Sequence, residues 1–112
     1  MSVEDSDVVD VVSIDKQTDD VILTVSDHLE WFDSCAHQEI LQTKLNRYLA
    51  FVESGELIER YPNAKGRSVT IKVVLKFSPD ADGREFLSRA GDVVASAGIG
   101  FRHEVFAESY DN

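Results

Sequence analysis

The segment Val69–Phe77, VTIKVVLKF, alternates apolar and other side chains, and this alternation limits the folds open to the chain. Successive side chains of a strand point to opposite faces of a sheet, so the odd-numbered apolar residues share one face while Lys72 and Lys76 share the other. The pattern predicts a strand whose sheet is covered on one face and solvated on the other. The covered face then requires a layer of helices.

A hairpin and a long helix are predicted ahead of this strand. Two β-branched runs, Val8–Ile14 and Val21–Ser26, are joined by the polar segment DKQTDD, which is typical of two paired strands. A helix is predicted from Ser34 to a left-handed stop at Gly55, because apolar residues recur there at helical spacing. Asp33 and Ser34 are expected to form its cap, with Ser34 as the N-cap residue. Its apolar stripe comprises Ile40, Leu41, Leu45, Tyr48, Leu49 and Val52.

The second half of the chain repeats the change from turn to strand to helix. Residues 61–68, YPNAKGRS, predict a turn, and Ser78-Pro79-Asp80 predicts a helix start in which the serine caps free amides and the aspartate opposes the helix dipole. This helix ends at Gly98, and a last strand covers residues 99–106. The apolar stripe of the second helix comprises Phe86, Leu87, Ala90, Val93, Val94 and Ala97.

The element order is therefore ββαβαβ. It predicts an α+β fold, a two-layer sandwich with a four-stranded mixed sheet and two helices on one face. Right-handed crossovers favour the strand order 1-2-3-4. We expect a single domain over residues 8–107, a disordered acidic tail at 1–7 and a polar tail at 108–112, because 112 residues suit one core.

The net charge of −10 excludes some classes of partner. Residues 1–60 carry fourteen acidic against four basic side chains, whereas residues 61–112 carry seven of each. A chain without a basic stripe repels phosphate backbones, so neither nucleic acid nor an anionic membrane is expected as a partner. No apolar run approaches the roughly 18 residues of a membrane helix, and the start MSVEDSD is unlike a signal peptide. The single cysteine cannot form a disulfide within the chain, which agrees with a reducing compartment. These features predict a cytoplasmic protein.

Two segments carry a resemblance to a known family. Residues 41–57, LQTKLNRYLAFVESGEL, and residues 61–73, YPNAKGRSVTIKV, together with Trp31 and His37, resemble a family of small bacterial proteins known only as a domain of unknown function. The similarity covers residues 8–90, and its most specific part is the helical segment. It implies a bacterial, stand-alone, single-domain protein and brings no activity or cofactor with it. Members of that family look acidic or polar at the position of Cys35.

The stretch EWFDSCAHQE gathers the candidates for chemistry. Cys35 lies in the first turn of the predicted helix, where free amides favour a thiolate. His37 lies two positions on, about 200° around the helix, so the two side chains should diverge. His28, His37 and Glu39 lack the spacing of zinc ligands, so no metal and no cofactor is expected.

Two surfaces have both a structural and a functional interpretation. Trp31 either packs onto the first turn of the helix as an apolar staple or serves as an exposed anchor for a partner. Lys72, Lys76 and Arg102 on the solvated sheet face either form ordinary cross-strand ion pairs or make a platform for a partner or a second copy. The candidate partner surface therefore comprises Trp31, His37, Lys72, Lys76 and Arg102.

Two functions remain open on the sequence alone. The first is a non-catalytic protein-interaction module, either homodimeric or an immunity-type inhibitor that meets a basic toxin through opposite charge. The second is a small enzyme or ligand-binding domain that uses the neighbourhood of Trp31, Cys35 and His37.

Overall fold

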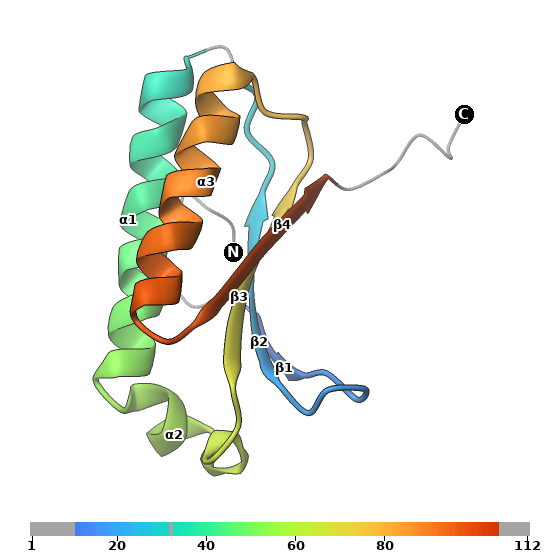
Figure 1. Cartoon of the computed structure of the whole chain (residues 1–112), viewed down its shortest axis with the longest axis vertical. Coiled ribbons are helices and arrows are strands. Elements are labelled where there is room, and N and C mark those ends of the chain that lie inside the picture. The colour runs from blue at the N-terminus through green and yellow to red at the C-terminus, as the bar shows by residue number, and fades with distance from the viewer. Residues whose placement is uncertain (1–10, 32, 106–112) are drawn as a thin grey trace.

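The computed structural model describes residues 11–31 and 33–105 as a four-stranded sheet with helices packed on one face (Figure 1). In chain order the elements are β1 (Val11–Ile14), β2 (Val21–Asp27), α1 (Ser34–Glu53), α2 (Glu56–Arg60), the 3-10 turn η1 (Pro62–Ala64), β3 (Val69–Leu75), α3 (Ala81–Ser96) and β4 (Gly100–Val105). The predicted two-layer α+β fold with a four-stranded mixed sheet is confirmed. Residues 8–10, Phe106 and the predicted tails (1–7 and 108–112) lie outside the described residues.

The sheet has the predicted strand order β1-β2-β3-β4. β1 and β2 form an antiparallel hairpin, whereas β2, β3 and β4 run parallel to one another. The two parallel connections carry α1 and α3, which lie side by side over the same face (Figure 1). Right-handed crossovers explain this placement, since both connections start and end on neighbouring strands.

The core lies between the sheet and the two long helices. On β3, Ile71, Val73 and Leu75 are at most 1% exposed while Thr70 and Lys72 on the other face stay half-buried, so the alternation seen in the sequence is real. The strand ends at Leu75, two residues earlier than predicted. The main buried partners from the other elements are Val21, Leu23, Val25, Leu41, Leu45, Tyr48, Phe51, Leu57, Leu87 and Val94.

Both long helices begin with an aspartate cap. Asp33 belongs to the pair expected to cap the first helix, whereas the choice of Ser34 as the N-cap residue and the serine cap expected for the second helix are wrong. The Asp33 carboxylate accepts a hydrogen bond from the Ala36 amide at 3.1 Å, and that of Asp80 accepts one from the Gly83 amide at 2.7 Å. Aspartate and serine are both good caps, so composition alone does not choose between neighbours. The Ser34 hydroxyl instead donates to Asp80 at 3.2 Å, which joins the N-termini of α1 and α3.

The short helix α2 was not predicted. Gly55 adopts the expected left-handed φ of +88°, but the chain then enters another helical turn and buries Leu57 to 1% exposure. Glu56 at its start lies 3.4 Å from the Arg47 guanidinium and 3.3 Å from that of Arg60. Five residues are too few for a helical period to show in a sequence.

The buried face of α1 is rotated relative to the predicted stripe. Leu41, Leu45 and Tyr48 are buried as expected, yet His37, Lys44 and Phe51 are also buried while Ile40, Leu49 and Val52 are only partly covered. The Lys44 ammonium lies 5.6 Å from the centroid of the Tyr48 ring, and the Tyr48 hydroxyl donates to the Thr24 carbonyl at 2.8 Å. A buried ammonium is exceptional, which is why the pattern of apolar residues misses it.

Candidate functional site

A buried aspartate and histidine meet where β2 ends against α1. His37 Nε2 lies 2.5 Å from Asp27 Oδ2, and the two residues are 3% and 2% exposed. The other oxygen, Asp27 Oδ1, accepts a hydrogen bond from the Leu29 amide at 3.0 Å. An ionised carboxylate only accepts hydrogen bonds, so in that form of the pair the imidazole Nε2 is the donor. This pair satisfies polar groups that are costly to bury alone.

Sequence reasoning missed Asp27, although a signal for it was present. Residues 21, 23 and 25 of the second predicted strand are apolar and face the helices, and Asp27 continues the same alternation. An acidic residue at an inward-facing strand position needs a polar partner in the core. His37 in the following helix is the polar partner that the chain supplies.

Trp31 covers this pair. Its ring stacks on the imidazole of His37, with centroids 3.6 Å apart and planes inclined by 25°. The indole Nε1 donates to the Phe77 carbonyl at 3.3 Å, and a β-carbon at Gly83 would lie 2.7 Å from the ring. Trp31 thus packs on the first turn of α1, and Phe32 beside it lies outside the described residues.

The Asp27–His37–Trp31 cluster lies at the carboxyl end of β2, the edge where open α/β sheets usually bind ligands. Here protein side chains fill that place. His37 Nδ1 is buried from solvent and has no hydrogen-bond partner among the described residues. A general base must reach its substrate, so an imidazole that is 3% exposed gives this cluster a structural rather than a catalytic geometry.

Cys35 and His37 face different surroundings. Cys35 is exposed and lines a hollow of about 280 Å³ between the first turns of α1 and α3, together with Gln38, Asp82, Glu85, Phe86 and Arg89. His37 points into the core, where Asp27 holds Nε2. The structure therefore does not bring the Cys35 thiol to the imidazole, which a nucleophile–base pair requires.

Two of the three basic candidates, Lys72 and Arg102, lie on the sheet face opposite the helices, and Lys76 follows the end of β3. Thr24, Lys72 and Arg102 are direct neighbours across β2, β3 and β4, so two cations stand side by side. Within residues 11–31 and 33–105, no salt bridge joins either cation to a carboxylate. The Lys76 ammonium lies 5.6 Å from the centroid of the Phe77 ring. The candidate partner surface is therefore not one surface. Trp31 and His37 pack together at the start of α1, whereas Lys72 and Arg102 lie on the open sheet face.

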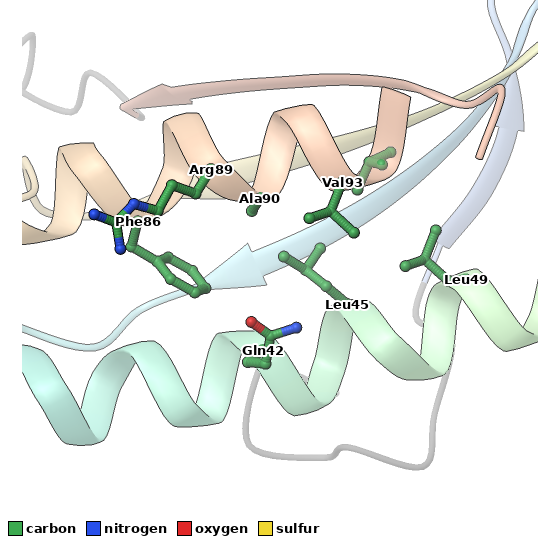
Figure 2. A pocket seen from close by; sticks show the side chains of 8 residues that line it. Gln42, Leu45, Leu49, Phe86, Arg89, Ala90 and Val93 are labelled. Atoms are coloured by element: carbon green, nitrogen blue, oxygen red, sulfur yellow. The ribbon is translucent and has the colours of Figure 1, made fainter. Parts of the chain in front are cut away.

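A shallow apolar groove separates α1 from α3. Figure 2 shows Leu45 and Leu49 of α1 pointing toward α3, and Phe86 and Val93 of α3 pointing back. The groove has a volume of about 210 Å³. Val93 is 56% exposed on it, although the sequence placed this residue in the buried stripe. Its remaining lining residues are Gln42, Arg89, Ala90 and Val94.

The described residues contain neither a metal-binding cluster nor a membrane-spanning helix. In the part of the chain that the structure describes, no three His, Cys, Asp or Glu side chains come close enough together to hold a metal ion. None of the helices within residues 11–31 and 33–105 combines the length and the apolar character that crossing a bilayer requires.

Fold and site define a small α+β protein with a closed polar cluster and an open, partly basic sheet face. Residues 1–107 match the family described as "Family of unknown function (DUF6572)", so the chain belongs to that family. The expected resemblance to a domain of unknown function is thereby confirmed. No curated protein matches the chain, and neither does any solved structure.

Proposed function

We propose that this chain is a non-catalytic protein-interaction module of the bacterial cytosol, which binds through the open face of its sheet and the adjoining edge strand β4. The observation that carries the proposal is the side-by-side placement of Lys72 and Arg102. The surface they define, with Lys76 just past the end of β3, is called the basic sheet face below. The partner that fits it presents carboxylates.

The physical argument rests on the energy of like charges. Two cations directly opposite each other on neighbouring strands repel one another and so destabilise a sheet. The chain has 21 Asp and Glu residues, yet none of the described ones forms a salt bridge with Lys72 or Arg102. A partner that brings carboxylates to this place relieves the repulsion, and the opposite charges speed the encounter.

The two other functions considered have less support. Catalysis at the Trp31, Cys35 and His37 neighbourhood needs an accessible base, and the imidazole is buried under the indole. An immunity-type role is a narrower form of the interaction proposal, in which the acidic first half meets a basic toxin. It rests on charge and size alone.

Replacing Lys72 by glutamate is expected to separate binding from stability. A glutamate at position 72 faces Arg102, so it should leave the melting temperature unchanged or raise it slightly. The same change should weaken partner binding at least about tenfold, because a cation on the contact surface becomes an anion. The measurement is co-purification of tagged chain from the cells that make it, followed by quantification of the bound protein.

Val93→Glu is the matched control, since it places the same charge on the α1–α3 groove on the other side of the molecule. We expect this variant to retain the partner. If Val93→Glu loses the partner and Lys72→Glu keeps it, the groove is the contact surface and the proposal for the basic sheet face is wrong.

A further inference from the structure

Strand β4 forms an edge of the sheet, and within the described residues it pairs with β3 alone. Five of its six residues are exposed, and Val105 is 41% exposed. Backbone groups on the outer side of an edge strand are a template for another strand. The sequence of β4, GFRHEV, determines which strand fits best.

We propose that β4 pairs with β4 of a second copy of this chain, antiparallel and about a twofold axis that passes beside His103. The pairing joins two four-stranded sheets into one continuous sheet. This pairing rests on the proposed function, because it names a second copy of the chain as the partner that binds at edge strand β4. A closed twofold dimer is also the commonest assembly of soluble proteins.

The open sheet face supplies the first argument. With His103 opposite its own copy, Arg102 lies opposite Glu104 of the second copy, and Glu104 lies opposite the second copy's Arg102. Both residues share the open face with Lys72 and are exposed. Two cross-strand ion pairs form, and Arg102 gains the carboxylate that the described part of its own chain does not supply.

The helix-facing side supplies the second argument. In the same register, Phe101 lies opposite Val105 of the second copy, and this contact also occurs twice. Phe101 is half-buried against α3, where a β-carbon at Gly91 would lie 3.2 Å from its ring. The exposed part of Val105 would therefore be covered by an apolar neighbour, which favours association.

Neighbouring registers lose this complementarity. If the axis moves one residue toward the start of β4, Arg102 lies opposite Arg102 of the second copy. If it moves one residue toward the end of β4, Glu104 lies opposite Glu104 of the second copy. Like charges directly opposite each other are destabilising. Of these three registers, only the axis beside His103 pairs opposite charges on the open face. On the helix-facing side it places Phe101 opposite Val105 and His103 opposite its own copy.

The helix layer leaves room for this arrangement. Gly91 marks the side of α3 that lies against β4, and Ser88 and Ala95 lie three and four residues from it on the same side. Their small side chains permit the α3 helices of two copies to approach across the axis. Arg84 also lies on this side, one turn before Ser88, and its guanidinium donates to the Pro79 carbonyl at 2.9 Å.

Charge reversal tests the register. In sedimentation equilibrium of the full chain, from about 1 µM to about 1 mM, the wild type is expected to form a reversible dimer. Glu104→Arg and Arg102→Glu should each weaken dimerisation at least about tenfold, since each turns both ion pairs into like-charge pairs. An equimolar mixture of the two variants should recover the dimer, because glutamates at 102 and 104 of one chain then face arginines at 104 and 102 of the other.

The recovery in the mixture also shows that both variants are folded. A chain that stays monomeric throughout this range overturns the inference, and so does a dimer that neither reversal weakens. Single variants that weaken the dimer without recovery on mixing overturn the register. Failure here is distinguishable from failure of the proposed function, because partner binding that depends on Lys72 can persist in a monomer.

Discussion

Asp27→Ala is expected to lower the free energy of unfolding by about 3–5 kcal/mol, the largest effect of any single change considered. The carboxylate holds two groups in the interior, the imidazole of His37 and the amide of Leu29. Removing it leaves both without that partner where little water reaches, since Asp27 is 2% exposed. Urea denaturation followed by circular dichroism measures the change.

Two variants make this measurement specific. Asp27→Asn retains an oxygen for the Leu29 amide and should cost less than Asp27→Ala. Asp33→Ala removes an exposed carboxylate that caps α1 through Ala36, so a loss of about 1 kcal/mol is expected. Equal losses for Asp27→Ala and Asp33→Ala would contradict the role assigned to the buried pair.

Gly83→Ala is expected to destabilise the protein by about 1–3 kcal/mol, even though alanine is the better helix former. The new methyl group would lie 2.7 Å from the Trp31 ring and 3.0 Å from the β-carbon of Pro79, so the indole must move. That movement breaks the stack on His37 and strains the bond from Nε1 to the Phe77 carbonyl. Trp31 is the only tryptophan of the chain, so its fluorescence reports the displacement directly.

Gly91→Ala provides the comparison within the same helix. Its β-carbon would lie 3.2 Å from the Phe101 ring, which must yield by only a few tenths of an ångström. We expect a change in stability within about 1 kcal/mol, because the gain in helix propensity offsets the tighter contact, and unaltered tryptophan emission. A Gly83→Ala protein with native emission and native stability would show that Trp31 is not held as described.

The layers of the fold are predictable because they depend on periodicity. The alternation along β3 and the apolar spacing in α1 and α3 together determine a sheet with one covered face. Crossovers between parallel strands are right-handed, and this rule leaves few possible strand orders. The exact helix starts are less predictable, because Asp33 and Ser34 are both good caps and only the three-dimensional geometry selects one.

The polar interior is harder to predict, since it depends on pairs that are distant in sequence. The alternation along β2 directs Asp27 inward, but its partner His37 becomes apparent only when β2 and α1 are placed together. Lys44 lies within the apolar stripe of α1 and is buried there, whereas its charge alone predicts a solvent position. The sequence predicts that Lys72 and Arg102 share the open face of the sheet. That they lie directly beside each other follows only from the register of β3 and β4.

Hydrogen exchange at β4 tests most directly whether this chain works by binding through its sheet edge. No strand among residues 11–31 and 33–105 pairs with the amides of Gly100–Val105 that point away from β3, and these amides become paired when two β4 strands meet. We expect their protection to rise with protein concentration while that of β1, at the other edge, stays constant. Exchange at β4 that is independent of concentration and unaffected by any co-purified partner would contradict the account.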